Sequence, residues 1–315
     1  MTITQDTSAP LVVVVGSTGA QGSSVIKALI ESDKPYRLRG LTRDTSKPAA
    51  KELTEKGVEM LAVEPGPENK EQIVKAFQGA DIVFAVTVLA MQRKELEEGK
   101  TFVDAAKVVN AKLFVFSGLV STSEASGGKY HVPHFDDKNE IVKYARASGI
   151  PRVVNVLIPM YFENLTNLSV TPRKQPDGSY AIFCVGPSDR AFPAICARQD
   201  YGLFVRKAIE VPDCPQDMFA YGERITWDEL AKQLSEATGK KVTYVQQSNE
   251  EFMKDFTSKG LPELIATVIL NMYLSSIEFG YYGKKDSGLN REVLAREPIA
   301  FREWAKLTDW SKILN

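Results

Sequence analysis

A histidine and a lysine stand one helical turn apart in the segment HFDDKNEIVKYARA, residues 134–147. In a helix His134 and Lys138 share one face, because residues four apart are neighbours on its surface. An imidazole titrates near pH ~6.5, which suits proton transfer. A neighbouring ammonium favours the neutral ring, so less of the protonated form is available to act as an acid. Lys138 is therefore the first candidate for a catalytic group. His134 is the second, and its alternative role is to order the start of the helix near Phe135.

His134 occupies the position where a short-chain dehydrogenase carries a tyrosine, four residues before the lysine. In those enzymes Ser, Tyr and Lys cooperate: the lysine holds the nicotinamide ribose and lowers the phenol pKa from about 10, so that the phenol can donate a proton. Ser117, in the apolar run LFVFSGL, supplies the serine, and the tyrosine is missing. The Y-x-x-x-K match formed by Tyr281 and Lys285 lies late in the chain, in a glycine-bracketed segment, and is interpreted as coincidence.

Three glycines lie between a buried strand and an amphipathic helix, in the segment GSTGAQG at residues 16–22. Gly16 permits a sharp turn, Gly19 lets the backbone approach a pyrophosphate, and Gly22 lets the helix pack close to the strand. The free N–H groups at the helix start then attract the anion. An anion-free tight turn is the alternative, but strand, turn and helix occur in the order that this mechanism requires. The segment predicts a dinucleotide-binding loop.

The residues after the second predicted strand, YRLRGLTR, indicate which dinucleotide binds. A carboxylate there would accept hydrogen bonds from a ribose 2′-hydroxyl and repel a 2′-phosphate. The chain instead has Arg43, followed by Lys47, and an arginine can bind a phosphate through two parallel hydrogen bonds. NADP(H) is therefore favoured. NAD(H) stays open because Asp44 is adjacent and because Arg43 can be an ordinary solvated cation at a strand end.

The elements that would position these residues alternate between strand and helix. LVVVV at Leu11–Val15 is a continuous β-branched run, the pattern of a strand buried on both faces of a parallel sheet. The alternation predicts an α/β, Rossmann-like doubly wound parallel sheet. It fails after Pro159, where further prolines break residues 160–197 into short or hairpin pieces. We expect a dinucleotide-binding domain at 1–159 and a smaller α+β domain at 160–315, with some late segments returning to the first sheet.

Two helices are predicted in the second domain. TWDELAKQLSEATGK begins with Thr226 and Glu229 in the positions of a capping box. The long apolar segment LPELIATVILNMYLSSIEFG is either core of the small domain or a docking face for another protein, and core is favoured. It contains Glu263, Asn271 and Glu278, which interrupt it too often for a membrane span.

The composition is that of an ordinary globular protein. With 315 residues, a formal net charge of −1 and a pI near 6.3, the chain offers no electrostatic reason to bind nucleic acid or an anionic membrane. The start is polar, with no visible signal peptide, and no metal site is predicted. Three cysteines without CxxC spacing favour a reducing compartment. We expect a cytoplasmic protein, with the nucleus as a second location.

Together these motifs resemble the NmrA-like family of atypical short-chain dehydrogenases, over nearly the whole chain. The motifs that carry the likeness are GSTGAQG, LTRD, DAAK, FSGL, PHFDDKNEIVKYAR, IPMYFENL, PDGSY and TWDELAKQLSEATGKKVTY. The branch that looks most similar includes a redox-sensing protein that binds NADPH. The resemblance implies a Rossmann domain with a small C-terminal domain, no active-site tyrosine, and binding of NADP(H) or NAD(H) that changes a protein partner or the oligomeric state.

The resemblance also implies cofactor contacts by position. The residues expected to contact the cofactor are Gly16, Ser17, Thr18, Gly19, Ala20, Gln21, Gly22, Arg43, Lys47, Thr87, Ser117, Lys138, Tyr161, Phe162 and Asn164. The first seven would cradle the pyrophosphate, Arg43 would meet the 2′-phosphate, and Thr87 would line the adenosine and ribose path. Lys138 would hold the nicotinamide ribose, and the last three would lie against the nicotinamide. Asn110 departs from the family, which commonly has a glycine there, and EPGPEN at residues 64–69 replaces its usual acidic turn.

Two functions fit these features. The first is a non-catalytic or weakly active NADP(H)-binding regulator that reports redox state through another protein. The second is an NADPH-dependent oxidoreductase of the quinone-reducing or isoflavone-reductase-like kind that uses Lys138, because water can protonate a reduced quinone. A scaffold that binds no nucleotide is disfavoured by the glycine loop and Arg43. The sequence ranks the regulator first.

Overall fold

The computed structural model describes residues 3–88, 94–167, 170–283 and 294–315. Within them, the larger part is a seven-stranded parallel sheet with the order β11-β6-β5-β4-β1-β2-β3, so the predicted doubly wound α/β fold is confirmed. Its strands are β1 (Leu11–Val15), β2 (Arg37–Thr42), β3 (Glu59–Ala62), β4 (Ile82–Ala85), β5 (Leu113–Gly118), β6 (Arg152–Leu157) and β11 (Asp217–Phe219). Its helices are α1 (Ala20–Ile30), α2 (Pro48–Glu55), the 3₁₀ helix η1 (Pro67–Asn69), α3 (Lys70–Phe77), α4 (Glu95–Val108), α5 (Thr122–Ala125), α6 (Pro133–Ala147) and α8 (Ala197–Glu210).

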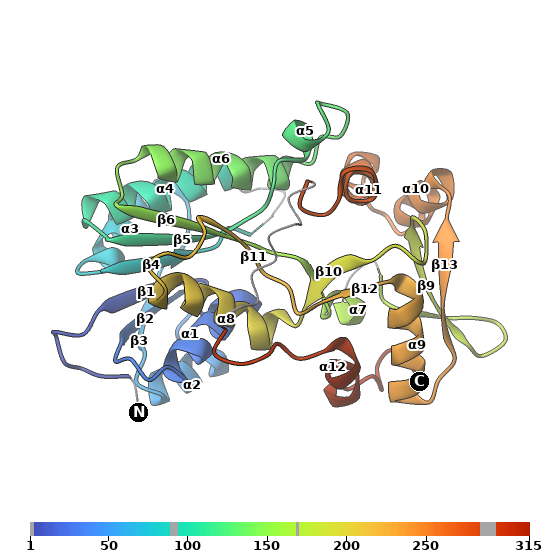
Figure 1. Cartoon of the computed structure of the whole chain (residues 1–315), viewed down its shortest axis with the longest axis horizontal. Coiled ribbons are helices and arrows are strands. Elements are labelled where there is room, and N and C mark those ends of the chain that lie inside the picture. Colours follow the sequence, from blue (N-terminus) through green and yellow to red (C-terminus); the bar gives the residue numbers. More distant parts are fainter. Residues whose placement is uncertain (1–2, 89–93, 168–169, 284–293) are drawn as a thin grey trace.

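β1 is buried on both faces, as its unbroken run of apolar residues predicts. Val12 and Val14 pack in the hydrophobic layer that contains α1 and α8, whereas Val13 and Val15 pack in the layer of α3, α4 and α6. Figure 1 shows these two groups of helices on opposite sides of the sheet. Helices therefore cover both faces, and no face of the strand is left to favour polar residues.

The α1 and α8 helices touch closely because α8 has a glycine at the contact. A Cβ atom added to Gly202 would lie 2.0 Å from the carbonyl oxygen of Ser24. The N–H group of Gly202 also donates a hydrogen bond to the Ser24 hydroxyl at 2.9 Å. The chain therefore returns to the large sheet late in the sequence, with α8 on one face and β11 beside β6 at one edge.

The rest of the chain builds a smaller α+β unit, at the right of Figure 1. It contains two three-stranded sheets within the described residues, with the orders β12-β10-β7 and β13-β9-β8. Its elements are β7 (Met160–Tyr161), α7 (Asn164–Asn167), β8 (Arg173–Lys174), β9 (Tyr180–Val185), β10 (Phe192–Ile195), β12 (Glu223–Ile225), α9 (Trp227–Thr238), β13 (Val242–Gln247), α10 (Asn249–Ser258), α11 (Glu263–Phe279) and α12 (Phe301–Leu307). Its core is rich in aromatic side chains, among them Trp227, Phe252 and Trp304.

Three local predictions can be compared with the structure. The capping box of α9 is confirmed, because the N–H of Glu229 donates to the Thr226 hydroxyl at 3.1 Å and the N–H of Thr226 donates to the Glu229 carboxylate at 2.9 Å. PDGSY forms the turn of the antiparallel β8–β9 hairpin, with Gly178 at φ +82°. Asn110 has φ +57°, a left-handed conformation that asparagine tolerates better than most residues. An asparagine therefore suits this turn.

The apolar helix α11 bridges the two parts of the molecule. Ala266 and Leu270 belong to the core of the small domain, which is the favoured prediction, while most other residues of the helix are only partly buried. Ile277 packs on the core of the small domain, whereas Met272 packs on a cluster at the start of α6. Among the described residues, no helix combines the length and the hydropathy that crossing a membrane requires.

Candidate functional site

A cavity of about 920 Å³ lies between the carboxyl edge of the large sheet and the small domain. Gln21, Thr87 and Lys138 belong to its sheet-side wall, and Phe192 and Trp227 belong to the wall of the small domain. Ligands of doubly wound sheets bind outside the carboxyl ends of the strands where the strand order reverses, which here is between β1 and β4. The volume also lies in the range of roughly 300–1,000 Å³ that is usual for small-molecule pockets. This cavity is the candidate site.

The glycine loop has the geometry that an anion-binding turn requires. Gly16 has φ +66°, a conformation that side chains other than glycine rarely adopt. A Cβ atom on Gly22 would lie 2.3 Å from the carbonyl oxygen of Gly16, so only glycine lets α1 start this close to the end of β1. No side chain in the described ranges caps the first turn of α1. The N–H groups of Ala20 and Gln21 can therefore bind an anion.

Two hydroxyl groups of the loop hold it on the neighbouring strand β2. The Ser17 hydroxyl donates to the carbonyl oxygen of Leu41 at 3.0 Å, and the hydroxyls of Thr18 and Thr42 are 3.2 Å apart. Gly40 permits this approach, because a Cβ atom there would lie 2.9 Å from the Ser17 hydroxyl oxygen. The Ser17 side chain is fully buried and supports the loop from behind, and a contact of Ser17 with the pyrophosphate stays a prediction.

Arg43 and Lys47 are exposed beside the glycine loop, just after β2. Among the described residues, no hydrogen bond or ion pair engages the Arg43 guanidinium. The Asp44 carboxylate is occupied by its own turn, since it accepts hydrogen bonds from the N–H and the hydroxyl of Ser46 at 2.8 and 2.6 Å. The Lys47 ammonium is 4.0 Å from that carboxylate. Arg43 is thus available to a phosphate, and the preference for NADP(H) stays a prediction.

Lys138 is buried together with Glu95 and Thr87. Its ammonium is 2.9 Å from the Glu95 carboxylate, and the two side chains are 6% and 4% exposed. It also donates to the backbone carbonyl and the hydroxyl of Thr87, at 3.0 and 2.7 Å. The Thr87 hydroxyl in turn donates to Glu95 at 2.7 Å. An ammonium has three N–H donors, so Lys138 directs all of them at these two residues.

His134 lines the cavity, but too little of its protonated form exists at neutral pH for it to serve as a general acid. Burial lowers the pKa of its imidazole to about 4; the Glu95 carboxylate opposes this shift and the Lys138 ammonium adds to it. The ring is therefore neutral at pH 7. It also packs edge-on against Phe135, with the ring centroids 5.0 Å apart, which is the structural role that the sequence offered as its alternative.

Ser117 lies outside the cavity, contrary to its predicted placement. It is fully buried within β5, where successive side chains point to opposite faces of the sheet. Ser117 therefore shares a face with Val115, which packs in the layer of α1 and α8. Lys138 lies over the ring of Phe116, on the other face. Consecutive residues of a strand point to opposite faces of the sheet, so Ser117 and Lys138 lie on opposite sides of it and do not meet.

The IPMYFENL segment places two of its three expected residues in the cavity. Tyr161 and Asn164 line it, and the side-chain amide of Gln21 donates to the Tyr161 hydroxyl at 2.6 Å. Phe162 does not line it, which corrects the prediction: its ring is fully buried in the core of the small domain, 5.2 Å from the ring of Phe301. Phe162 directly follows the last residue of β7, and consecutive residues of an extended chain face opposite ways.

Three phenols, those of Tyr161, Tyr273 and Tyr281, line the cavity even though the usual tyrosine is missing. Burial raises the pKa of both Tyr161 and Tyr281, so both stay protonated and can donate hydrogen bonds. Lys285, the other half of the Y-x-x-x-K match, lies outside the described residues. Sequence spacing offered no reason to choose Tyr161 or Tyr281 as a donor, because they reach the cavity from β7 and from the turn after α11.

Glu163 is a further residue that sequence reasoning missed. Its carboxylate accepts hydrogen bonds from the N–H groups of Ala197 and Arg198, at 3.1 and 3.0 Å. A negative charge at this end of α8 complements the helix dipole. Because α8 packs on α1, this contact fixes the small-domain wall relative to the helix that carries the glycine loop. Glu163 and Glu95 carry no local signal in the sequence, since their partners are distant in the chain.

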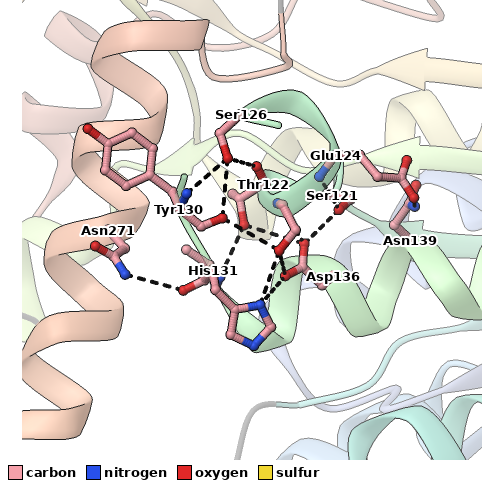
Figure 2. A network of polar contacts seen from close by, with 11 residues as sticks. Ser121, Thr122, Glu124, Ser126, Tyr130, His131, Asp136, Asn139 and Asn271 are labelled. Atoms are coloured by element: carbon pink, nitrogen blue, oxygen red, sulfur yellow. Dashed lines mark hydrogen bonds and ion pairs between the residues drawn. The ribbon is translucent and has the colours of Figure 1, made fainter. Parts of the chain in front are cut away.

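A polar network links the start of α6 to α11, on the side of the cavity lined by both helices (Figure 2). The Asp136 carboxylate accepts hydrogen bonds from the hydroxyls of Ser121 and Ser123, at 2.7 and 2.6 Å, and lies 2.8 Å from Nδ1 of His131. The side-chain amide of Asn271 on α11 donates to the backbone carbonyl of His131 at 3.4 Å. These contacts tie the loop around α5 to the small domain.

A doubly wound sheet with an uncapped glycine loop at its switch point defines the Rossmann class of α/β proteins, here in a variant without the tyrosine of short-chain dehydrogenases. The particular family follows from the sequence. Residues 8–311 match the NmrA-like family, and the chain belongs to that family.

Individual proteins show the same relationship. The chain is 26% identical to the NmrA-like family domain-containing oxidoreductase malD of Malbranchea aurantiaca, over 95% of this chain and 96% of that protein. It is 34% identical to the oxidoreductase ptmS of Penicillium ochrochloron, in a match that spans 48% of this chain and only 47% of ptmS. Among solved structures, NmrA, a negative transcriptional regulator in complex with NADP, superposes with a TM-score of 0.74 at 19% identity, over 95% and 94% of the two chains. The Escherichia coli quinone oxidoreductase QOR2 with NADPH superposes with a TM-score of 0.73 at 18% identity, over 94% and 99%.

Proposed function

We propose that this protein is an NADP(H)-dependent oxidoreductase that reduces a quinone or another conjugated carbonyl compound. The observation that supports this proposal is the extent of the cavity, which runs from the first turn of α1 to aromatic side chains of the small domain and so offers walls to two molecules. A protein that only senses a dinucleotide does not require the second wall. For this reason we reverse the order that the sequence alone favours. The relatives malD and ptmS are both named oxidoreductases, which agrees.

The residues present fit a nicotinamide dinucleotide. The N–H groups at the start of α1 would hold the pyrophosphate, and Arg43 with Lys47 would hold a 2′-phosphate. Gln21 has a buried carbonyl oxygen with no partner among the described groups, although the residue lines the cavity. A buried acceptor without a donor is costly, and a ligand hydroxyl or amide would satisfy it. When bound, the cofactor supplies the hydride.

The chain's own residues then have to stabilise the negative charge that develops on the substrate's carbonyl oxygen. The electron pair that arrives on carbon pushes the carbonyl electrons onto oxygen, which takes a proton from water. Lys138 directs its N–H groups at Thr87 and Glu95, so we propose that it exchanges its contact with Thr87 for one with the developing oxyanion, which its positive charge then stabilises. Tyr161, a protonated phenol, can donate a hydrogen bond to the same oxygen. Neither role requires the missing tyrosine.

NADPH oxidation in the presence of a panel of quinones and enones tests the proposal. We expect turnover with at least one member, and a loss of roughly 10- to 100-fold in kcat/KM for Lys138→Met. Lys143→Met is the matched control, because Lys143 is exposed on the same helix and paired with Glu124 and Glu140. A protein that binds NADPH but turns over no member of the panel contradicts the proposal.

A second candidate function is a regulator that responds to the cofactor's redox state. The observation that favours it is the complete engagement of the Lys138 ammonium by Thr87 and Glu95, since a ribose that binds this lysine has to displace one of them. The polar network from α6 to α11 offers a route from that change to the small domain. Light scattering with saturating NADPH and with NADP tests this candidate: a cofactor-dependent change of mass without turnover supports it.

A further inference from the structure

The imidazole of His134 has a fixed position in the wall of the cavity. His134 lies in the first turn of α6, one helical turn before Lys138, and both residues line the cavity. Its ring packs edge-on against the ring of Phe135, with the centroids 5.0 Å apart and an interplanar angle of 76°. Phe135 is itself buried in a cluster with Leu119 and Val132. Packing therefore orients the imidazole before any ligand binds.

The two nitrogens of this ring differ in their surroundings. Nδ1 is buried and has no hydrogen-bond partner among the described residues. Nε2 also lacks a partner in the described part of the chain, but unlike Nδ1 it is not buried. Because His134 lines the cavity, Nε2 is the ring nitrogen that is open to a ligand there.

The ring is neutral at the pH at which the protein works. Burial is the largest influence and lowers the pKa of His134 to about 4. Among the charges that act on the ring, the Glu95 and Asp136 carboxylates favour the imidazolium and the Lys138 ammonium opposes it. The positive end of the α6 dipole also disfavours a cation in the first turn.

The surroundings of Nδ1 also indicate which nitrogen carries the proton. A neutral imidazole has one N–H donor and one acceptor nitrogen. A buried N–H without an acceptor is costly and is rarer in proteins than a buried acceptor without a donor. Since Nδ1 has no acceptor within the described residues, the proton belongs on Nε2. His134 thus presents an N–H group to the cavity.

We infer that His134 is a catalytic residue of this site, whose neutral Nε2–H donates a hydrogen bond to the carbonyl oxygen of the substrate. The inference rests on the proposed function and deepens it. The hydride brings its electron pair to a substrate carbon, the carbonyl π electrons move onto oxygen, and water protonates that oxygen, so the imidazole keeps its own proton. Neutral histidines at helix starts can polarise carbonyl groups in this way.

The position of His134 on α6 agrees with this role. It is the helix position, one turn before the lysine, at which short-chain dehydrogenases have their tyrosine. A donor at this position can therefore reach the same oxygen as Lys138, and the site retains a second group for the developing negative charge. The group stabilises this charge by a hydrogen bond and not by proton transfer, for which the buried ring is unsuited.

Nitrogen-15 NMR of the full chain, labelled on histidine, tests the protonation state without any turnover. The chain has two histidines, His131 and His134, so a spectrum of His131→Gln assigns the signals. With NADP bound, we expect the His134 signals of a neutral ring with the proton on Nε2, unchanged between pH 5.5 and 8. An imidazolium at pH 7, or a ring with the proton on Nδ1, overturns the inference.

NADPH oxidation with 1,4-naphthoquinone as the probe tests the catalytic role. His134→Phe keeps a ring and removes the N–H, and it should lower kcat/KM by roughly 10- to 100-fold. His134→Gln retains an N–H donor and should keep kcat/KM within about tenfold of wild type. His131→Phe replaces the exposed histidine outside the cavity lining and is the matched control, with no loss expected.

The outcomes separate this inference from the proposed function. Wild-type kcat/KM in His134→Phe overturns the inference, as does a wild-type rate that falls as the pH rises through ~6.5 and loses this dependence in His134→Gln, the behaviour of an imidazolium acid. A wild-type chain that turns over no quinone or enone overturns the proposed function, whereas the NMR spectrum decides separately whether the ring can donate. His134→Leu also removes the N–H and takes the place of His134→Phe if circular dichroism shows that His134→Phe does not fold.

Discussion

Lys138 and Glu95 are both buried, and each supplies the countercharge of the other. Removal of one partner of such a pair leaves a buried charge without compensation, which costs about 3–5 kcal/mol. We therefore expect Glu95→Gln to lower the free energy of unfolding by that order, measured by urea denaturation at pH 7. The double variant Glu95→Gln with Lys138→Met should recover most of the loss, because it removes both charges.

Glu97→Gln is the matched control for this pair, since Glu97 is exposed on the same helix. It should change the free energy of unfolding by no more than about 0.5 kcal/mol. If Glu95→Gln destabilises the protein as little as Glu97→Gln does, the ion pair makes no measurable contribution to the free energy of unfolding.

His134 predicts how stability depends on pH. The folded-state pKa of about 4 lies below the value of ~6.5 expected in the unfolded chain, because burial disfavours the imidazolium. The unfolded state therefore binds the proton more readily, and stability falls as the pH decreases from ~6.5 to about 4, by up to ~3 kcal/mol in total. His134→Gln should flatten this dependence in urea titrations at pH 4.5, 5.5 and 7. His131→Gln, which alters the exposed histidine, should keep it; the same slope in wild type and His134→Gln would remove His134 as its cause.

Arg43 decides the nucleotide preference if its guanidinium binds the 2′-phosphate. Arg43→Ala should weaken NADPH by roughly 10- to 100-fold, the size of a lost charge-assisted contact, and leave NADH nearly unchanged. Lys51→Ala, an exposed change on α2, is the control and should affect neither. Calorimetric titrations with both nucleotides provide the measurement. An equal loss of affinity for NADPH and NADH would show that Arg43 does not bind the 2′-phosphate.

At the scale of elements, Asp136 connects α6 to the loop around α5. Its carboxylate accepts hydrogen bonds from Ser121 and Ser123 and lies beside His131, whose carbonyl oxygen meets α11 (Figure 2). Burial raises the pKa of this carboxyl, but the hydrogen bonds from Ser123 and Ser121 outweigh it and hold the pKa below its usual value. The charged form is thus the one that the network stabilises.

In Asp136→Asn an amide N–H group faces the Ser121 and Ser123 hydroxyls, which donate hydrogen bonds to the carboxylate in the wild type. We expect a loss of about 1–3 kcal/mol of unfolding free energy and faster amide hydrogen exchange in residues 121–131. Asp137→Asn is the adjacent control: burial and the charges of Glu95 and Glu97 raise the pKa of Asp137, so removal of its charge should not destabilise the protein. Unchanged exchange in Asp136→Asn would mean that α11 or the backbone alone orders this loop.

The sequence predicts elements well where the signal is local. The unbroken apolar run of Leu11–Val15, the glycine loop and the Thr226 capping box each depend on neighbours in the chain, and the structure has all three. Side-chain direction is harder to predict, because one residue of register turns a strand side chain to the opposite face. Ser117 and Phe162 were misplaced for that reason, although their segments were located correctly.

Partnerships between distant residues had no sequence signal at all. Glu95 reaches Lys138 because α4 and α6 pack against each other, and Glu163 reaches Ala197 because two strands of the small domain are adjacent. Such pairs follow from topology, and a single sequence contains the pattern of its elements but not the contacts between them. The sequence predicted Lys138 as a catalytic or ribose-binding group but not its partners, and the structure shows its ammonium engaged by Thr87 and Glu95.

At the scale of the whole molecule, the first part of the small domain is inserted between β6 and β11 of the large sheet, and the rest of the small domain follows β11. The N–H of Phe162 donates to the carbonyl oxygen of Ile195 at 2.9 Å, and β7 pairs with β10, so the chain enters and leaves the first part of the small domain side by side. α8 and β11 then complete the large sheet. The small-domain wall of the cavity and the glycine loop are therefore held by one continuous framework.

This arrangement predicts that residues 1–159 do not fold alone. Without α8 and β11 the fragment loses Tyr201, Phe204 and Met218, all fully buried in the layer against α1. Burial of each of these side chains contributes about 1.5–3 kcal/mol to the free energy of unfolding. Their loss is large beside a total stability of only about 5–15 kcal/mol. A fragment that joins 1–161 to 195–222 through a short glycine–serine linker restores the layer, because Tyr161 and Ile195 are paired neighbours. We expect cooperative thermal unfolding by circular dichroism for the linked fragment and none for 1–159. A cooperative transition in 1–159 would show that β1 to β6 and their helices form an independent folding unit.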